Sequence, residues 1–383
     1  MDSSLQSSSK LQSVLAAAGK PLLVESAGTL EQAIQAWSRS EVLGLDTEFV
    51  RERTFRADLG LVQVFDGENC WLIDPMALGD LDPLADFLGN STMMKVIHSG
   101  SEDMEVLFHR LGSVPRAIVD SQIACAMLGQ PLQLGYHHAV DWLFGVEIEK
   151  DHTRSNWLRR PLSSGQLRYA ALDVVLLPTM MRRLQVELGQ LGRWAWLQED
   201  VQRMIRASTQ DVDPGRAWAR IGGAGSLSDS ERVVLSALAA WREHTAMEKN
   251  IARGFVVADS SLLAMARRKP HSKADLGQIE KLHPKAVERY GETWLALVAQ
   301  APSNPPVQPL PQLSRAQRTL LNTMRKRVAA IADSLKVDAA LLASRKQLER
   351  LIFTYSQSGR LPERFDGWRK AVVTAELLEI MQG

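Results

Sequence analysis

Two acidic side chains, Asp46 and Glu48, stand near the end of an apolar stretch at residues 42–50 whose composition predicts a buried β-strand. Successive side chains of a strand point to opposite faces, so Asp46 and Glu48 share one face, while Thr47 and Phe49 point to the other. Neighbouring carboxylates repel each other and are costly to bury. A hard divalent cation between them would remove this cost. Hydrated acids at a solvent-exposed strand end fit the stretch equally well.

Three further residues have side chains suited to the same chemistry. Asp103 follows a short predicted strand at residues 95–98, but an acid in the first turn of a helix is also favoured by the helix dipole, and this simpler explanation is the better one for Asp103 alone. Tyr169 and Asp173 are four residues apart on a predicted helix and therefore share a face. A plain Tyr–Asp hydrogen bond at the helix edge is the structural alternative.

Taken together and in order, these five residues resemble the three motifs of the DEDDy 3′→5′ exonucleases. The residues around them resemble the ribonuclease D family in particular, at Asp46-Thr47-Glu48-Phe49-Val50-Arg51, His98-Ser99-Gly100-Ser101-Glu102-Asp103, Trp157-Leu158-Arg159-Arg160-Pro161-Leu162 and Tyr169-Ala170-Ala171-Leu172-Asp173-Val174. Two C-terminal helical segments resemble the paired HRDC domains of that family. The resemblance covers residues 22–380, about the whole chain.

The resemblance implies an α/β fold, in which an RNase H-like mixed-sheet exonuclease domain precedes two small all-α HRDC-type domains. It also implies two divalent metal ions, Mg²⁺ or Mn²⁺, as in other two-metal phosphodiesterases. Asp46 would bridge the ions, Glu48 and Asp173 would hold the ion that activates water, Asp103 would hold the other, and Tyr169 would orient the water. The expected activity is release of nucleoside 5′-monophosphates from RNA 3′ ends, in maturation of tRNA precursors and other small structured RNA.

Four other residues are weaker candidates for contacts with the nucleic acid. Phe49 is placed to stack on a terminal base, His98 to touch the substrate, and Lys150 and Arg154 to contact phosphates. Each has an ordinary structural alternative: a core phenylalanine, a hydrogen-bonded histidine at a strand end, and a solvated basic loop. The sequence has no Walker-type glycine-rich phosphate loop, so we expect no nucleotide cofactor.

Hydrophobic periodicity predicts the elements that position these side chains. Strands are expected at residues 22–24, 42–50, 59–65 and 70–74, with a helix at 30–37, and the last three strands should form an antiparallel meander with tight turns. From residue 81 helices and strands alternate, and helices dominate from 120 to 209. This order predicts a mixed sheet covered by helices.

Composition shifts predict the domain boundaries. We expect a disordered extension at residues 1–20, the exonuclease domain at 21–212, one helical domain at 216–300 and a second at 313–383. The helical domains repeat Leu-Ser and Leu-Leu-Ala pieces about eighty residues apart, which indicates two copies of one fold. Residues 301–312 hold five prolines and predict a semi-rigid linker that keeps the last domain away from the exonuclease domain.

Composition limits the class of protein. The 383 residues are 45% hydrophobic and 23% charged, with two cysteines, no apolar run long enough for a membrane and no signal peptide, so we expect a cytoplasmic protein. We also expect a monomer. Residues 1–215 hold 19 Lys and Arg against 28 Asp and Glu, whereas residues 313–383 hold 13 against 7. A basic C-terminal part suits a polyanionic partner. The expected exoribonuclease has two alternatives: a DNA-directed 3′→5′ exonuclease, and a catalytically inert nucleic-acid-binding protein on the same fold.

Overall fold

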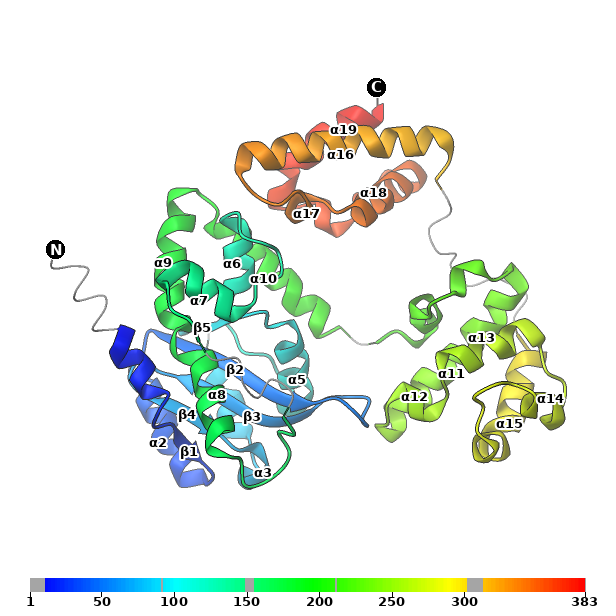
Figure 1. The fold of residues 1–383 in the computed structure, drawn as a ribbon. Coiled ribbons are helices and arrows are strands. Elements are labelled where there is room, and N and C mark those ends of the chain that lie inside the picture. Colours follow the sequence, from blue (N-terminus) through cyan, green and yellow to red (C-terminus); the bar gives the residue numbers. More distant parts are fainter. Residues whose placement is uncertain (1–10, 91, 149–154, 211, 302–312, 383) are drawn as a thin grey trace. The chain divides into compact units, whose positions relative to one another are not determined.

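The computed structural model describes residues 11–90, 92–148, 155–210, 212–301 and 313–382. The chain divides into two compact units (Figure 1). The first unit contains residues up to 50, residues 59–210 and residues 313–383, and the second contains residues 51–58 and 211–312. The predicted linker and the predicted contacts Lys150 and Arg154 lie outside the described residues, apart from Ala301.

The first unit is built on one mixed β-sheet, as the sequence predicts. The strands run in the order β1-β4-β3-β2-β5-β6, and their bounds are β1 Leu22–Val24, β2 Val42–Val50, β3 Asp58–Phe65, β4 Cys70–Ile73, β5 Met94–Ile97 and β6 Ile118–Asp120. β1 pairs with β4, β2 with β5, and β5 with β6 in parallel, while β3 and β4 are antiparallel. Their near-continuous apolar sequences fit strands that are covered on both faces.

Helices pack on this sheet and bury its apolar side chains (Figure 1). α8 and α9 lie against β2, α5 also contacts β2, and α10 contacts β6 and α5. The helices of this part are α2 Ala27–Trp37, α3 Pro75–Leu78, α4 Asp82–Leu88, α5 Ser101–Leu111, α6 Ser121–Met127, α7 Tyr136–Phe144, α8 Ser164–Val175, α9 Leu177–Gln190 and α10 Trp194–Ser208. The central strand β2 is therefore held between helices that come from distant parts of the sequence.

The connection between β2 and β3 is not the tight turn that the meander prediction requires. It spans residues 51–57 and belongs to the second unit. Phe55 is 8% exposed within that unit's core, the guanidinium carbon of Arg253 lies 4.4 Å from the centre of its ring, and the Ala252 amide donates to the Arg53 carbonyl at 2.8 Å. These contacts give the connection partners in the second unit, so β2 and β3 are joined by a seven-residue loop and not by a tight turn.

The prediction of a disordered extension up to residue 20 is wrong for its second half. Residues 11–17 form a helix in which Val14 is buried, and Ala18 directly after it is buried too. The spacing of Leu11, Val14, Leu15 and Ala18 places apolar side chains on one helical face, which explains why this segment packs.

The second unit is a helical domain around a tryptophan-rich core. Its elements are η1 Pro214–Arg220, η2 Ala224–Ser226, α11 Asp229–Lys249, α12 Arg253–Val256, α13 Asp259–Arg268, α14 Lys273–Gly277 and α15 Pro284–Ala299. Trp294 is fully buried, with its ring 5.7 Å from that of Trp241 and 5.8 Å from that of Tyr290. Buried Glu243 is neutralised by Arg253, which donates two hydrogen bonds to its carboxylate.

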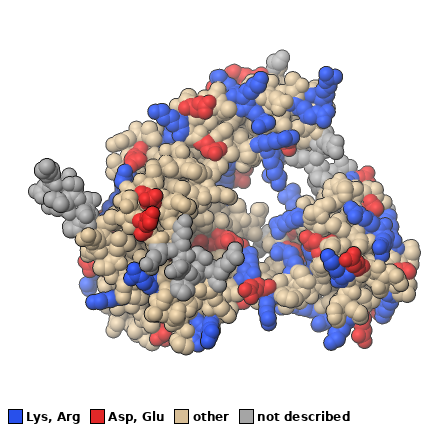
Figure 2. Space-filling view, in the orientation of Figure 1, with Lys and Arg blue, Asp and Glu red and all other residues tan. Residues whose placement is uncertain are grey.

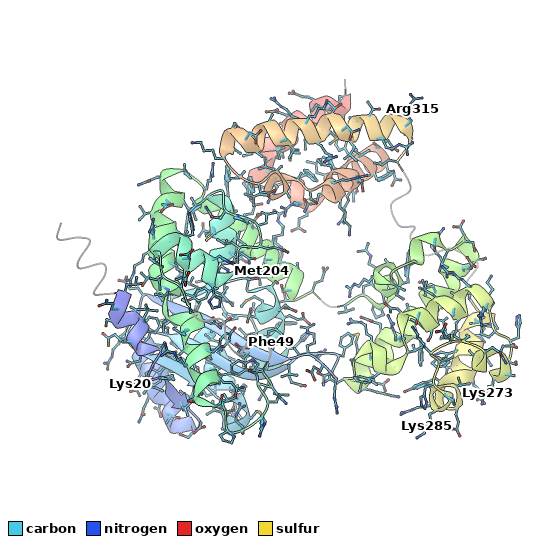
Figure 3. All side chains as sticks on the ribbon, viewed as in Figure 1. Lys20, Phe49, Met204, Lys273, Lys285 and Arg315 are labelled. Atoms are coloured by element: carbon cyan, nitrogen blue, oxygen red, sulfur yellow. The ribbon has the colours of Figure 1, made fainter. Side chains whose placement is uncertain are left out.

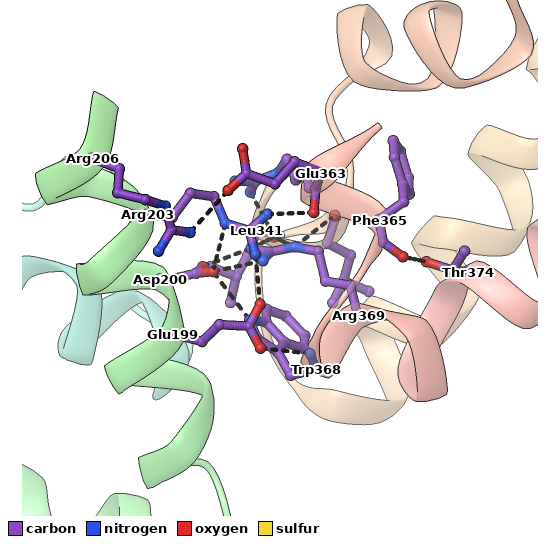
Figure 4. A network of polar contacts seen from close by, with 12 residues as sticks. Glu199, Asp200, Arg203, Arg206, Leu341, Glu363, Phe365, Trp368, Arg369 and Thr374 are labelled. Carbon is purple, nitrogen blue, oxygen red and sulfur yellow. Dashed lines mark hydrogen bonds and ion pairs between the residues drawn. The ribbon is translucent and has the colours of Figure 1, made fainter. Parts of the chain in front are cut away.

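The last helical segment packs directly on the exonuclease part, which corrects the prediction that the linker keeps them apart. Its elements are α16 Arg315–Leu335, α17 Ala339–Leu342, α18 Arg345–Ser358, η3 Glu363–Phe365, η4 Lys370–Thr374 and α19 Ala375–Gln382. Arg369, fully buried, donates from both terminal nitrogens to Asp200 of α10 at 2.7 Å (Figure 4). The rings of Trp196 and Trp368 stack with centroids 4.4 Å apart. Linker length therefore does not decide where this segment lies.

No helix in the described ranges is long and apolar enough to cross a membrane. Lys and Arg side chains are frequent on the face of residues 313–382 that Figure 2 shows, and they are frequent on the second unit as well. Both parts carry the excess of basic residues that the sequence indicates.

Candidate active site

The first pair of candidate residues is carried by the central strand β2. Asp46 and Glu48 are partly buried near its carboxyl end, and Thr47 between them is 5% exposed. At Gly44 on the same strand, a Cβ atom would lie 2.5 Å from the Val174 carbonyl oxygen of α8. Only glycine permits this close approach, which brings the end of α8 against the strand.

Asp103 is positioned by a turn that leads from β5 into α5. Ser99 has a positive φ of 63°, and the next two residues begin the helix. The carboxylate of buried Asp120 accepts hydrogen bonds from the amides of Ser99 at 3.3 Å and Gly100 at 2.8 Å, and so fixes the turn. Asp103 then lies in the first helical turn and is 7% exposed.

Tyr169 and Asp173 lie on α8, as predicted. The helix begins with a capping box between Ser163 and Gln166, which satisfies its first free amides. The Tyr136 hydroxyl donates to the Leu172 carbonyl at 3.0 Å and so holds the end of the helix that carries Asp173. The Tyr169 hydroxyl donates a hydrogen bond to the Asp173 carboxylate.

Burial raises the pKa of all four carboxylates, and the charges of the other acids raise it further for Asp46 and Glu48. Burial and the charges of Asp103, Asp173 and Glu48 raise the pKa of Asp46 well above its ordinary value. Burial, Asp173 and Asp103 raise the pKa of Glu48 to about 9. Burial raises the pKa of Asp173 to about 7 and that of Asp103 to about 6. A site of this kind is stabilised by positive charge.

The donor set fits a hard divalent cation, because it consists of four carboxylates. The described residues do not, however, contain a group of three or more His, Cys, Asp or Glu side chains already arranged around one metal position. The Asp103 carboxylate is turned to Thr47, whose hydroxyl donates to its Oδ1, and the Asp173 carboxylate is turned to Tyr169.

Thr47 and Asp120 contact the segment that carries Asp103, and the motif pattern reveals neither of them. Strand alternation places Thr47 on the face opposite to Asp46 and Glu48, where it is expected to pack in the core. Its partner Asp103 is 56 positions away in the sequence. Asp120 follows a strand and precedes a helix, which marks it as an N-cap, and it does accept from the amides of Gln122 and Ile123. Nothing local links it to the turn before Asp103.

The weaker candidates lie in different surroundings. Phe49 is partly buried near the carboxyl end of β2 (Figure 3). His98 has protein partners at both ring nitrogens, with Nδ1 2.8 Å from the Ser121 hydroxyl and Nε2 2.8 Å from the Leu134 carbonyl. Burial lowers the pKa of His98, although Asp120 opposes this effect. A contact from His98 to RNA would have to replace one of its two hydrogen bonds.

Three family models match successive parts of the chain. A 3′-5′ exonuclease model matches residues 22–189, an HRDC domain model matches residues 231–298, and a model described as the C-terminal HRDC domain of ribonuclease D matches residues 316–377. The first match includes all five of the candidate residues described above.

Relatives and solved structures extend the similarity to nearly the full chain. Ribonuclease D of Pseudomonas paraeruginosa is 35% identical over 360 residues, which are 92% of this chain and 96% of that protein. Ribonuclease D of Escherichia coli is 34% identical over 363 residues, with the same two coverages. The crystal structure of E. coli RNase D, described as an exoribonuclease involved in structured RNA processing, matches with a TM-score of 0.87 and 32% identity over 95% of this chain and 99% of that chain.

Proposed function

This chain belongs to the ribonuclease D family and is a 3′→5′ exoribonuclease, and we propose which of its residues carry the reaction and which RNA it trims. The proposed substrates are the 3′ ends of tRNA precursors and other small structured RNAs in the cytoplasm, with the enzyme acting as a monomer. The observation that carries the assignment of residues is that β2, α5 and α8 bring four buried or partly buried carboxylates together with Tyr169, close enough for Asp103 and Asp173 to act on Asp46 and Glu48.

The exonuclease fold of this family is metal-dependent in general. We propose that Asp46, Glu48, Asp103 and Asp173 together hold two divalent ions, Mg²⁺ or Mn²⁺. Bound ions of this kind make water a stronger nucleophile and stabilise a leaving oxygen. The four carboxylates would supply the negative charge that retains the ions. Bound cations would offset the burial that raises the pKa of all four, and the repulsion that raises the pKa of Asp46 and Glu48 further.

Tyr169 orients the attacking water in this proposal. Burial and the nearby Asp173 charge raise the pKa of Tyr169 far above its ordinary value, so the phenol keeps its proton and acts as a neutral hydrogen-bonding group. Water adds to the phosphorus of the last internucleotide phosphate while the bond to the preceding 3′ oxygen breaks. The products are a nucleoside 5′-monophosphate and an RNA shortened by one residue with a free 3′ hydroxyl.

The test uses the full chain with Mg²⁺ and matched 3′-labelled RNA and DNA strands. Wild type should release labelled mononucleotides from RNA, EDTA should stop the reaction, and a 3′-phosphate on the RNA should block it. Asp46→Asn should abolish cleavage while RNA binding persists, because it removes a metal ligand with little change of shape. Near-normal turnover by this variant would refute the ligand assignment, and preference for the DNA strand would refute the proposed substrate.

A further inference from the structure

The segment at residues 157–160, which precedes α8, is clamped to the sheet by one arginine. All five N–H groups of Arg160 have acceptors: Nε and one terminal nitrogen donate to the two oxygens of Asp74, and the terminal nitrogens also donate to the carbonyls of Gly60 at 2.7 Å, Trp157 at 2.8 Å and Arg159 at 3.0 Å. Every N–H group of the planar guanidinium therefore has an acceptor. A lysine, which has one ammonium group with three donors, cannot reproduce this arrangement.

The other end of the clamp is rigid because Asp74 is fixed by its own neighbours. It follows β4 and caps α3, accepting from the amides of Met76 at 2.9 Å and Ala77 at 3.2 Å. Its own amide donates to the Val24 carbonyl of β1 at 3.0 Å. Asp74 is 6% exposed, whereas the Arg160 side chain is 25% exposed, so the carboxylate is shielded from water and the guanidinium only in part.

The clamped segment also touches the sheet at Gly60 of β3. A Cβ atom at this position would lie 2.7 Å from the Trp157 carbonyl oxygen and 2.8 Å from the Trp157 Cβ. The absence of a side chain at Gly60 thus lets the Trp157 backbone rest on the strand, and Arg160 donates to the carbonyls of both Trp157 and Gly60.

The Trp157 side chain links this clamp to the candidate active site. It is 2% exposed, and its ring lies 6.0 Å from the ring of Tyr169, centroid to centroid, with 35° between the planes. Tyr169 in turn donates to Asp173. A chain of contacts therefore leads from Asp74 and Arg160 through Trp157 to the hydroxyl that is proposed to orient water.

We propose that Arg160 and Asp74 are positioning residues for the exonuclease reaction, which act by holding the Trp157 ring against Tyr169. This inference rests on the role proposed for Tyr169. An ordinary structural clamp would use the same contacts to stabilise the fold, so the test must separate an effect on Tyr169 from an effect on stability.

The first experiment compares Arg160→Lys and Asp74→Asn in the full chain with Arg369→Lys. The control pair, Arg369 with Asp200, is likewise joined by two hydrogen bonds, and its arginine also donates to main-chain carbonyls, but it is more deeply buried and lies at the contact with the last helical segment. On a short single-stranded RNA at saturating Mg²⁺, the two clamp variants should lose kcat by about tenfold or more with KM nearly unchanged. Arg369→Lys should keep the wild-type kcat.

The second experiment is a double-variant cycle with Tyr169→Phe. If the clamp acts through the Tyr169 hydroxyl, Arg160→Lys should cost little further kcat once that hydroxyl is gone. Fully additive losses would overturn the proposal, even if each single variant is slow.

A third variant keeps the proposal testable if Arg160→Lys does not fold. Trp157→Leu removes the ring beside Tyr169 but leaves the carbonyl that Arg160 binds. It should also lose kcat by about tenfold, and wild-type kcat in a folded Trp157→Leu protein would overturn the inference. An inactive wild type or an active Asp46→Asn would instead refute the assignment of the active site, so the two failures are distinguishable.

Discussion

The hydrogen bond from Thr47 to Asp103 occupies one oxygen of a proposed metal ligand. We predict that Thr47→Val lowers kcat by about 10–100-fold, because a nearly isosteric side chain without the hydroxyl leaves this buried oxygen without its donor and frees the carboxylate to turn. Single-turnover release of mononucleotides from a short 3′-labelled RNA measures the effect. Thr47→Ser retains the hydroxyl that donates to Asp103, so its kcat should remain within a few-fold of the wild-type value. A wild-type rate in the valine variant would show that the bond is dispensable.

Tyr169 has two possible roles that a single substitution separates. Tyr169→Phe keeps the ring, which packs near Trp157, and removes only the hydroxyl that donates to Asp173. We predict a loss in kcat of about 10²–10³-fold with nearly unchanged metal affinity, by analogy with losing one positioned hydrogen-bonding group. Calorimetric titration with Mn²⁺ checks the second half of the prediction. Collapse of metal binding would make Tyr169 a support for Asp173 and not a catalytic group.

Motif spacing predicts the five candidate residues but not the groups that contact them. Asp46 and Glu48 are recognisable because acids are unusual in an apolar strand, and Tyr169 and Asp173 because a four-residue spacing shares a helix face. Thr47, by contrast, looks like an ordinary core residue, and its bond to Asp103 depends on how α5 packs against β2. Interactions of this kind arise from tertiary packing, which leaves no local pattern in the sequence.

The β2–β3 connection contributes an anchor to the second unit. We predict that Phe55→Ala destabilises that unit by about 3–5 kcal/mol, the usual cost of truncating a buried phenylalanine, because Phe55 is 8% exposed in its core. Hydrogen exchange of the α11 amides in the full chain measures this locally, which avoids assuming that the whole chain unfolds in one step.

A matched control for this prediction lies in the same unit. Phe255 on α12 is 66% exposed, so Phe255→Ala should change the exchange free energy of α11 by no more than about 0.5 kcal/mol. Equal protection of α11 in the two variants would mean that the connection merely lies on the unit without stabilising it.

The strands were predictable at the element scale because each is a continuous apolar run between turn residues. The contact of the β2–β3 connection with the second unit was not predictable. The segment Arg51-Glu52-Arg53-Thr54-Phe55-Arg56 is almost entirely charged and polar, which favours a solvated turn. Its one aromatic residue finds partners about two hundred positions later, at Arg253. No window of local sequence contains that information.

At the scale of the whole molecule, the last helical segment is part of the body that carries the active site. Burial alone would raise the pKa of Asp200, but the hydrogen bonds and charge of Arg369 outweigh it and hold that pKa below its ordinary value. Deleting residues 313–383 would remove both 2.7 Å hydrogen bonds from Arg369 and leave this buried carboxylate with Arg203 at 3.8 Å. It would also uncover the face of the Trp196 ring that stacks on Trp368. Truncation therefore confounds RNA binding with stability, and surface substitutions are the better test of what the basic residues do.

We expect the basic residues of the last helical segment to bind phosphates of a structured RNA at a distance from its 3′ end. Arg325 and Lys326 are exposed on α16 and line one groove with Asp338 and Arg345. We predict that the double variant Arg325→Gln/Lys326→Gln weakens binding of a tRNA-sized RNA. The slope of log K against log salt should fall by about 0.9 for each duplex phosphate that the protein no longer neutralises. Turnover of a saturating short RNA should not change, because the proposed ligands all lie between residues 46 and 173.

The matched control for this groove is the double variant Lys20→Gln/Arg39→Gln, which removes the same charge from exposed positions in the acidic part of the chain. It should keep the wild-type slope, because only a charge that lies against a phosphate releases a counterion on binding. If both double variants keep wild-type affinity and slope, the RNA does not contact this groove. If both lower the slope equally, the attraction is a long-range effect of net charge, which a groove-specific contact does not explain.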